Sequence, residues 1–311
     1  MVPKCYFGFS KQLERSKKRT VTDIFSWFPL YCLSDGQEAG GGMLVLEDLT
    51  KRPGQLILRL EKNCLMDFPQ VSAALTSLAH FHGCSWRWVN RKIKEKTSGL
   101  GQKRKNMNFR DLQRLHEDSW FLGFCFKTIF GMMRKMLRTF LQNREESSHF
   151  ISRLDAFMKN DIYDVMQAMW SHRCSTKFDT IVHGSFWASN ILFQYPRGNG
   201  GQIPEKGLFV DFQQIGLGNP SRDILSLLYT NTTAAFREKY LEILIDKYFT
   251  TFQQYFQGVF FMSSTANNYQ EFRDNVEQNR KFGLAWGLYM ICVGKTECNG
   301  SLDVRDEVRD N

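Results

Sequence analysis

The chain has 311 residues, of which 42% are hydrophobic and 23% charged, and it carries a formal net charge of +9. This composition is that of a globular protein with one large domain or two lobes, which excludes a disordered or fibrous chain. The 27 phenylalanines predict thick aromatic packing between helices. The positive charge is typical of a solvated basic surface and would also attract anionic ligands such as nucleotides, but no nucleic-acid-binding motif accompanies it.

The sequence gives no indication of export or of a membrane span. Residues 11–20 are strongly charged, so no apolar secretory segment follows Met1. The apolar segment 120–133 contains Lys127, and the apolar run 282–293 is too short to cross a bilayer. The 8 cysteines follow no framework of spacings, and we therefore expect a cytoplasmic protein with free thiols.

The first 49 residues predict short strands joined by polar and glycine-rich loops. Strands are expected at 2–9, 24–33 and 43–46, separated by a basic loop at 10–20 and a glycine-rich turn at 34–42.

Helical periodicity begins near residue 66. Mostly apolar positions recur at spacings of three and four and predict one buried stripe, made of Val71, Ala74, Leu75, Leu78, Ala79 and His82. His80 and Cys84 would share a face of this helix, but His82 points elsewhere and no fourth ligand is visible, so we expect no zinc site. The basic, weakly apolar segment 87–110 predicts a mobile connector.

The remainder of the chain predicts a helix-rich body that encloses a small β-insert. Helices are expected at 111–145, 147–172, 223–230, 234–257 and 269–293. Between the second and third of these helices, strands are expected at 178–184, 191–194 and 208–212, with a Gly/Pro-rich hairpin loop at 195–206.

A loop with the pattern His-x-Ser-x-x-x-x-Asn joins two of these strands. It runs from His183 through Ser185 to Asn190, and Asp211 follows an apolar strand further on. In phosphotransferases the spacing H-x-D-x-x-x-x-N supplies a carboxylate that deprotonates the acceptor hydroxyl and an amide oxygen that, with a second carboxylate, holds Mg²⁺ against the phosphates. Here Ser185 stands in the place of the catalytic base, His183 would brace the loop, and Asn190 and Asp211 would be the metal ligands.

Two other interpretations of this loop carry less weight. A plain strand–loop–strand with polar residues at the turn would not account for the combined spacing of His183, Asn190 and Asp211. A hydrolase pair of His183 and Ser185 is excluded, because no third orienting acid and no nucleophile elbow accompany them.

These segments resemble the ecdysteroid kinase-like family, also called the CHK-kinase-like family, which is related to choline kinases and aminoglycoside phosphotransferases. The resemblance extends from about residue 2 to about residue 293, and its anchors are 44–49, 78–86, 183–193, 210–213 and 219–224. It implies an α/β (α+β), protein-kinase-like fold with two lobes. It also implies ATP and Mg²⁺ as cofactors and phosphorylation of a hydroxyl on a steroid or another apolar molecule.

The resemblance also assigns roles outside the loop. Leu46, Glu47, Asp48 and Leu49 would form the hinge whose backbone hydrogen-bonds adenine, with a plain core strand as the alternative for this segment. Asp223 would be a buried structural acid near a helix start, with a helix N-cap as the equal alternative.

The chain departs from the family pattern in three ways. The Ser185 hydroxyl is neutral near pH 7, and the loss of a general base typically costs about 10²–10⁴-fold in rate. The glycine-rich loop, the phosphate-holding Lys and its partner Glu of relatives would lie upstream, so we expect a truncated N-terminal lobe. Segments 2–6 and 28–32 both resemble the strand that precedes the hinge, which makes the connection over 10–42 longer than usual.

We therefore expect a partial N-terminal lobe with the hinge over 1–49, a helical C-terminal lobe with the β-insert over 50–295 and a charged tail over 296–311. Two functions compete. The first is a small-molecule kinase, impaired by Ser185, that takes a nucleotide and a small apolar hydroxyl-bearing molecule, with the Phe-rich segments 109–145 and 235–290 as pocket walls or as plain core. The second is a pseudokinase that binds a nucleotide, ligand or protein partner without turnover.

Overall fold

The computed structural model describes residues 5–9, 43–46, 48–51, 55–60, 64–97, part of 128–139, 147–159, 176–196, 203–212, 214–256 and 265–294. Contacts between residues divide the chain into two units, 2–53 and 54–311.

The described residues of the first unit form a β-hairpin and a short turn. Strand β1 (Cys5–Phe9) pairs antiparallel with β2 (Met43–Leu46), with Phe9 opposite Met43. A short 3₁₀ turn, η1 (Leu49–Lys51), follows. The strand expected at 43–46 is confirmed, and the one expected from residue 2 begins at Cys5, whereas the strand expected at 24–33 lies outside the described residues.

Helix α2 (Phe68–Thr97) is the longest of the elements described in the second unit. It begins with a reciprocal cap, because the Gln70 backbone N–H donates to Asp67 Oδ1 at 2.8 Å and the Asp67 N–H donates to Gln70 Oε1 at 3.1 Å. The predicted stripe from Val71 to His82 is buried. The connector expected from residue 87 is wrong up to Thr97, because α2 continues to that residue; 98–110 lies outside the described residues.

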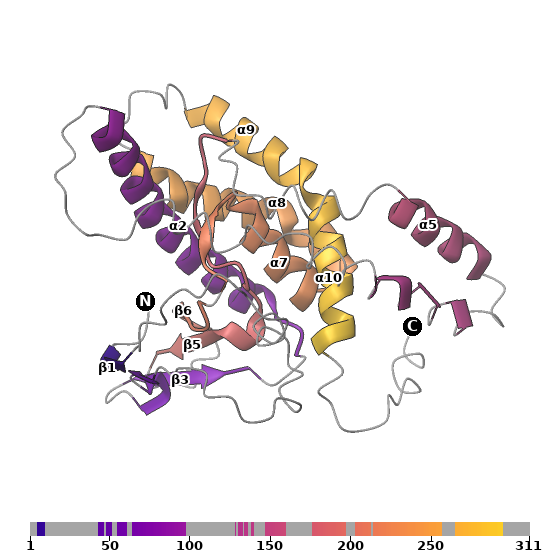
Figure 1. Ribbon diagram of the computed structural model, residues 1–311, viewed down its shortest axis with the longest axis horizontal. Coiled ribbons are helices and arrows are strands. Elements are labelled where there is room, and N and C mark those ends of the chain that lie inside the picture. The colour runs from indigo at the N-terminus through magenta and orange to yellow at the C-terminus, as the bar shows by residue number, and fades with distance from the viewer. Residues whose placement is uncertain are drawn as a thin grey trace, which may run out of the picture. The chain divides into compact units, whose positions relative to one another are not determined.

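A three-stranded antiparallel sheet packs against α2. Its order is β3–β5–β6, with β3 (Leu56–Arg59), β5 (Ile191–Tyr195) and β6 (Lys206–Phe209). Strands β5 and β6 confirm the expected hairpin, while β3 was not expected from the sequence. Figure 1 shows these three strands near one end of α2, and the Ser77 hydroxyl of α2 accepts the Gly207 N–H of β6 at 2.9 Å.

A second, two-stranded sheet carries the His-x-Ser loop. Strand β4 (Thr180–Val182) pairs antiparallel with β7 (Gly216–Gly218), which was not expected. The Thr180 hydroxyl donates to the His82 carbonyl oxygen at 2.8 Å, so β4 is fixed to the middle of α2.

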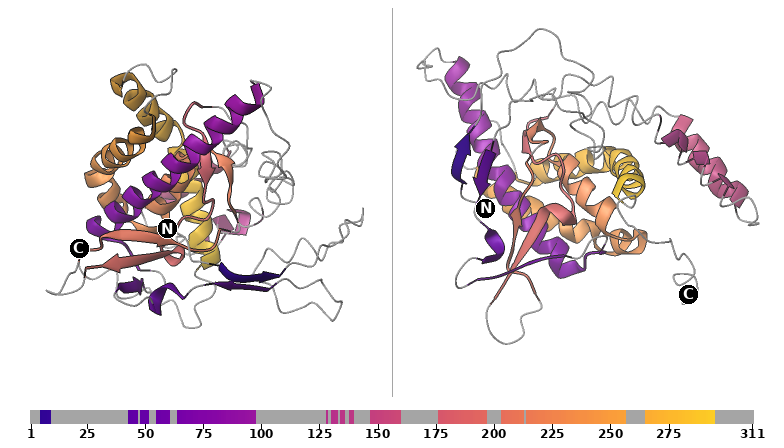
Figure 2. Two further views of the ribbon diagram at one scale, coloured as in Figure 1. Left: turned by 90° about the vertical axis from the view of Figure 1, so that its left-hand side faces the viewer. Right: turned by 60° about the horizontal axis from the view of Figure 1, so that its bottom comes forward.

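The C-terminal half of the second unit is helical. It contains α7 (Ser221–Asn231), α8 (Ala234–Phe252), η3 (Gln253–Phe256), α9 (Thr265–Gln278) and α10 (Arg280–Gly294). Helix α8 lies along α2, and α10 lies against α7, as the views in Figures 1 and 2 show. The single helix expected over 269–293 is wrong, because it is broken at Asn279, whose side chain donates to the Asn275 carbonyl at 2.8 Å and to the Ser221 hydroxyl at 3.2 Å.

Aromatic rings fill the space between α2, α8 and α9. Phe178 packs edge-on against Phe272 with ring centroids 5.3 Å apart, and Tyr248 stacks on Phe272 at 5.5 Å. Trp86 of α2 contacts Phe256 at 4.7 Å. These buried rings confirm the expected aromatic packing. Among the described phenylalanines of 235–290, Phe236 is half-buried and five lie in the core: Phe249, Phe252, Phe256, Phe272 and Phe282.

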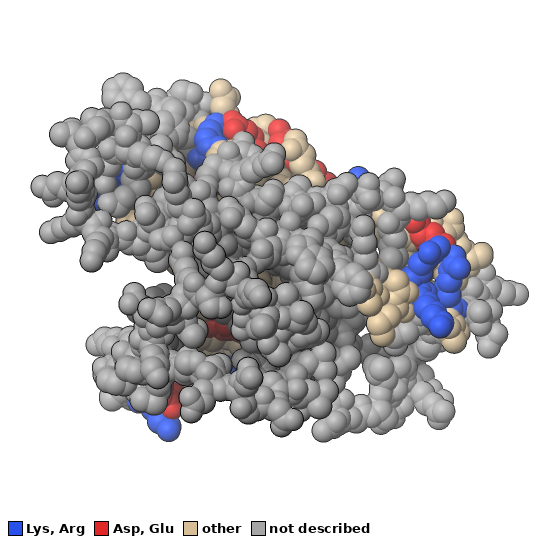
Figure 3. All heavy atoms as spheres, in the orientation of Figure 1, with Lys and Arg blue, Asp and Glu red and all other residues tan. Residues whose placement is uncertain are grey.

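Helix α5 (Ser147–Lys159) confirms the first part of the helix expected over 147–172, whose end lies outside the described residues. Acidic and basic side chains lie side by side in Figure 3 where α5 meets the segment 128–139. Arg134 Nε and Arg138 Nη2 donate to the Asp155 carboxylate at 2.6 and 2.5 Å, and these hydrogen bonds lower the pKa of Asp155 to about 2.

The described part of the chain is thus a helix-rich α+β structure with small antiparallel sheets, as expected. Within it, no helix combines the length and hydrophobicity needed to cross a bilayer.

Candidate active site

The His-x-Ser loop leaves the end of β4 through a turn that only glycine fits. Gly184 has φ of 85°, in the left-handed region. A Cβ atom at this position would lie 2.0 Å from the Gln214 carbonyl oxygen. The loop backbone therefore approaches the 214 segment more closely than any side chain would allow.

The carboxylate of Asp223 holds the start of the loop. Its Oδ2 accepts the His183 backbone N–H at 2.6 Å, and its Oδ1 accepts the Gly184 N–H at 2.9 Å. Burial alone would raise the pKa of Asp223, but the hydrogen bond from His82 and the nearby positive groups outweigh it, so the pKa is lowered and the group is ionised at neutral pH. The buried structural acid is thus confirmed, and the N-cap alternative is wrong, because Pro220 occupies that position.

A second buried histidine supports Asp223 from behind. His82 Nε2 lies 3.0 Å from Asp223 Oδ2, and His82 Nδ1 lies 2.6 Å from the Tyr248 hydroxyl. Because the carboxylate accepts, Nε2 donates, and the Tyr248 hydroxyl binds the other ring nitrogen, Nδ1. Burial raises the pKa of Tyr248 well above its usual value, which keeps this hydroxyl protonated. The stripe periodicity indicated that His82 is buried but gave no sign of these partners.

The guanidinium of Arg222 binds the same turn. Its Nη2 donates to the Gly184 carbonyl oxygen at 3.3 Å, and the side chain is 1% exposed. Burial lowers the pKa of Arg222 to about 10, so it is still protonated at neutral pH beside Asp223.

His183 joins two parts of the loop backbone through its ring. Its Nε2 lies 2.9 Å from the Val210 carbonyl oxygen and must donate to it, so Nδ1 accepts the Ser185 N–H at 3.4 Å. Burial lowers the pKa of His183, against the opposing charge of Asp223, which favours this neutral tautomer. Both ring nitrogens are thus engaged with the backbone.

Ser185 and Asn190 face each other across the loop. The Asn190 side-chain Nδ2 donates to the Ser185 carbonyl oxygen at 2.9 Å and lies 3.3 Å from the Ser185 hydroxyl. The two residues are 7% and 6% exposed. With Nδ2 fixed in this way, the orientation of the amide oxygen of Asn190 is fixed as well.

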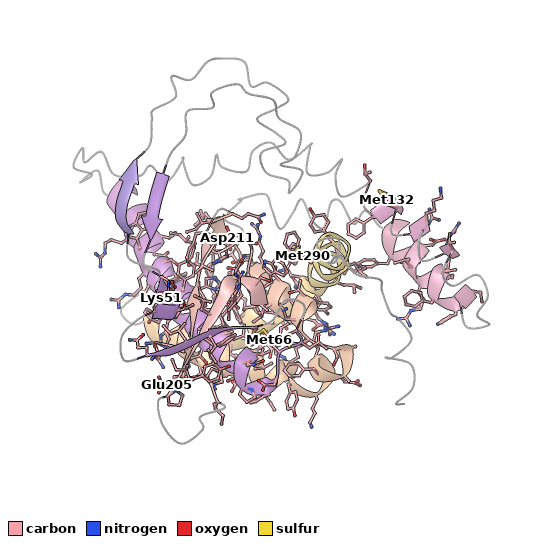
Figure 4. The ribbon with its side chains drawn as sticks, turned by 90° about the horizontal axis from the view of Figure 1, so that it is seen from below. Lys51, Met66, Met132, Glu205, Asp211 and Met290 are labelled. Carbon is pink, nitrogen blue, oxygen red and sulfur yellow. The ribbon has the colours of Figure 1, made fainter. Side chains whose placement is uncertain are left out.

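Asp211 lies beside Asn190 through a backbone contact. The Val210 N–H donates to the Asn190 carbonyl oxygen at 3.1 Å, which continues the pairing of β5 with β6 by one step. Asp211 follows directly, is exposed, and has φ of 64°, the only positive φ of a non-glycine residue in the described segments. Figure 4 labels it on the second unit.

The donor set of these two residues suits a hard cation. An amide oxygen and a carboxylate are the ligands that Mg²⁺ prefers, and Mg²⁺ is usually held by one or two protein groups together with phosphates and water. The described residues contain no group of three or more His, Cys, Asp or Glu side chains that could hold a metal alone. Asn190 and Asp211 therefore fit a phosphate-bridged Mg²⁺ better than a structural metal.

The expected hinge residues belong to the first unit. Leu46 ends β2 opposite Cys5, Leu49 is buried, and Glu47 lies outside the described residues. The Asp48 carboxylate accepts the Thr50 hydroxyl at 2.6 Å and its N–H at 3.1 Å, and these bonds, with that from Lys51, lower the pKa of Asp48. The Asp48 side chain thus stabilises the η1 turn.

His80 and Cys84 of helix α2 lie apart from this site. His80 Nδ1 lies 2.9 Å from the Tyr255 hydroxyl, and Cys84 is an exposed free thiol. Only His82 of the three residues takes part in the site.

Two contacts on the turn η2 (Ala188–Asn190) were not expected from the sequence. The Ala188 N–H donates to Asn231 Oδ1 at 3.0 Å, and Arg59 Nη2 donates to the Ser189 carbonyl oxygen at 2.8 Å. The partners are 43 and 130 residues away in the sequence, so no local pattern could have indicated them.

The α+β fold, the His-x-Ser-x-x-x-x-Asn loop and the adjacent Asp define a kinase-like protein. Residues 4–259 match the profile of the ecdysteroid kinase-like family, and the chain belongs to that family. No curated protein shows a significant match to the chain.

Proposed function

We propose that this protein is an ATP-dependent small-molecule O-phosphotransferase that acts on a hydroxyl of a steroid-like or other apolar molecule and that Ser185 slows its chemistry. Membership of the ecdysteroid kinase-like family supports small-molecule kinase-like activity. The observation that carries the proposal is the backbone hydrogen bond from Val210 to Asn190, which brings the two oxygen-donor residues of the loop and the following strand side by side.

Asn190 and Asp211 are the proposed ligands of Mg²⁺, which would supply charge neutralisation at the phosphates when bound. Asp223 and Arg222 hold the start of the loop, and His183 joins it to Val210, before any ligand arrives. The backbone of Leu46–Leu49 is the proposed adenine contact. Each of these assignments follows the family pattern residue by residue.

Ser185 lies where the acceptor hydroxyl would meet its base. A serine hydroxyl cannot take up a proton at neutral pH, and the missing base is expected to cost about 10²–10⁴-fold. Phosphoryl transfer depends mostly on positioning and electrostatic stabilisation, so slow transfer is compatible with this loss.

The alternative function is a pseudokinase that binds a nucleotide, a ligand or a protein partner without turnover. The observation that favours it is the nearly complete burial of Ser185 and its contact with Asn190 Nδ2 at 3.3 Å, which engages the hydroxyl within the protein. Turnover of any hydroxyl acceptor by the wild-type protein would exclude this alternative.

A thermal-shift titration with ATP tests the nucleotide site. Binding to the folded state raises the apparent melting temperature, because it adds about 2.7 kcal/mol to the free energy of unfolding at a ligand concentration 100 times Kd. We expect a shift with ATP plus Mg²⁺ that EDTA reduces and that Asp211→Asn removes, while Asp274→Asn, on the surface of α9, leaves it intact. No shift at millimolar ATP would contradict the proposal.

A further inference from the structure

Asn190 is the last residue of the η2 turn, and the hydrogen bonds that the structure describes for Asp223 do not reach this turn. Asp223 and Arg222 bind residues 183 and 184, at the start of the loop. Asn190 lies at the other end of the loop. Within the turn, the Asn190 N–H donates to the Trp187 carbonyl oxygen at 2.9 Å. The sheet holds Asn190 itself through the Val210 N–H at 3.1 Å, and a further attachment is needed to fix Ala188 and Ser189 relative to the body.

Asn231 supplies that attachment from the opposite end of α7. Its Oδ1 accepts the Ala188 N–H at 3.0 Å, and the residue is 5% exposed. Asp223 and Asn231 are eight residues apart on one straight element, so the two attachments lie about 12 Å apart along the helix axis. Helix α7 therefore holds both ends of the loop with one rigid element.

The side chain of Asn231 is itself fixed by its neighbours. Its Oδ1 also lies 2.8 Å from the Thr230 hydroxyl, whose proton is shared with the Ser226 carbonyl oxygen at 2.6 Å, and its backbone carbonyl accepts the Met66 N–H at 2.8 Å. These bonds leave the amide oxygen little freedom, so the Ala188 N–H is bound by an acceptor whose own position is determined.

Arg59 binds the same turn from the solvent side. It ends strand β3, opposite Leu192, and its Nη2 donates to the Ser189 carbonyl oxygen at 2.8 Å. The turn is thus held at two consecutive residues, from the core by α7 and from the surface by β3, and the third residue of the turn is Asn190.

We infer that Asn231 and Arg59 are positioning residues that set the place of Asn190 for Mg²⁺–nucleotide binding. The metal-binding part of this inference rests on the proposed function, whereas the restraint of the turn does not. Neither residue is a proposed metal ligand, and both act through the backbone of Ala188 and Ser189.

Two readouts separate this role from a general loss of stability. The first is deuterium exchange in peptides covering 184–192, which reports the restraint of the turn without any nucleotide. The second is the Mg²⁺ concentration that gives half of the Mg²⁺-dependent increase in the thermal shift with ATP, with the shift in EDTA as the baseline. Supporting residues of metal ligands typically change metal affinity by about 10–100-fold.

Asn231→Leu removes the acceptor at similar volume, and Asn268→Leu is the matched control. Asn268 is equally buried, but its Oδ1 accepts Lys177 Nζ at 2.8 Å, away from the loop. We expect Asn231→Leu to exchange about tenfold faster or more at Ala188 and to need about 10–100-fold more Mg²⁺. We expect Asn268→Leu to melt at a lower temperature with wild-type values for both readouts.

Arg59→Met and Arg59→Lys provide a second pair at an exposed position that does not endanger folding. Methionine keeps the length of the side chain without a donor, whereas lysine keeps a donor for the Ser189 carbonyl. We expect Arg59→Met to exchange faster and to need a higher Mg²⁺ concentration for half of the Mg²⁺-dependent increase in the thermal shift with ATP. We expect Arg59→Lys to have wild-type values for both readouts. If Asn231→Leu does not fold, this pair decides the question.

Wild-type exchange over 184–192 in both Asn231→Leu and Arg59→Met would overturn the inference, whatever the nucleotide result. If the wild-type protein shows no Mg²⁺-dependent shift at all, the proposed function fails, and faster exchange in these variants would still establish the restraint of the turn.

Discussion

The Asn190 side-chain amide donates to the Ser185 backbone carbonyl at 2.9 Å and approaches the Ser185 hydroxyl at 3.3 Å. The residue in the place of the base and the first proposed metal ligand are therefore linked directly. The first of these bonds does not depend on the side chain at position 185. A substitution at Ser185 can change the chemistry of the site while the orientation of Asn190 is kept.

Gly184→Ala should unfold the loop. The new Cβ would lie 2.0 Å from the Gln214 carbonyl at a φ of 85°, and both the clash and the backbone strain are unfavourable. We expect a loss of about 3 kcal/mol or more in the free energy of unfolding. Gly218→Ala on β7 is the control, since its Cβ would meet Val182 at an ordinary 3.5 Å, and it should cost less than about 1 kcal/mol in denaturant titrations. Equal losses for the two variants would show that the turn at Gly184 is not as tight as described.

Tyr248→Phe should lower stability by about 1 kcal/mol, because it removes the hydroxyl that binds His82 Nδ1 at 2.6 Å inside the core. Tyr240→Phe, on the same helix but half-buried among Phe68 and Phe236, should change it by less than half of that amount. Urea unfolding of both variants measures the difference. If Tyr248→Phe were as stable as the wild type, the hydrogen bond to His82 would contribute nothing to the support of Asp223.

Asp211 combines a proposed role as a metal ligand with backbone strain. A non-glycine residue at φ of 64° costs about 1–2 kcal/mol relative to glycine. We expect Asp211→Gly to be about 1 kcal/mol more stable to unfolding than Asp211→Ala, while both lose the Mg²⁺-dependent part of the ATP shift. Retention of that part in both variants would remove Asp211 from the metal site.

His183 should make stability depend on pH in the neutral to mildly acidic range. Burial holds its pKa in the folded state below the unfolded value of about 6.5, so the unfolded state binds more protons between these two values. The free energy of unfolding should therefore be highest above about pH 6.5 and fall as the pH decreases towards the folded pKa. His183→Gln should flatten this slope. An unchanged slope in His183→Gln would assign the effect to another group.

The sequence predicted the elements whose residues carry a local pattern. The stripe from Val71 to His82 follows the helical period and is buried, and the hairpin of β5 and β6 appears where apolar runs flank a Gly/Pro-rich loop. The family motif led to His183, Ser185, Asn190 and Asp211, and the structure brings Ser185 close to Asn190 and Asp211 next to it in the sheet register.

Features decided by distant partners could not be predicted in this way. The end of α2 was expected as a loop because residues 87–97 are basic and weakly apolar, yet Arg, Lys and Glu are good helix formers when one face points to solvent. The short strand β7 exists only because β4 pairs with it, and the helix break at Asn279 depends on Ser221. Likewise, the bond between His82 and Tyr248 joins residues 166 apart.

The measurement that tests the central claim most directly is phosphotransfer from ATP to a panel of apolar hydroxyl compounds by the wild-type protein and by Ser185→Asp, with Mg²⁺ present. The account predicts slow transfer by the wild type and an increase of about 10²–10⁴-fold in Ser185→Asp, because a carboxylate restores the base while Asn190 stays bound to the backbone at 185. Ser185→Asn, which adds similar bulk without a base, should show no increase. If Ser185→Asp binds Mg²⁺–ATP but transfers no faster than Ser185→Asn, the protein is not a phosphotransferase that lacks only its base.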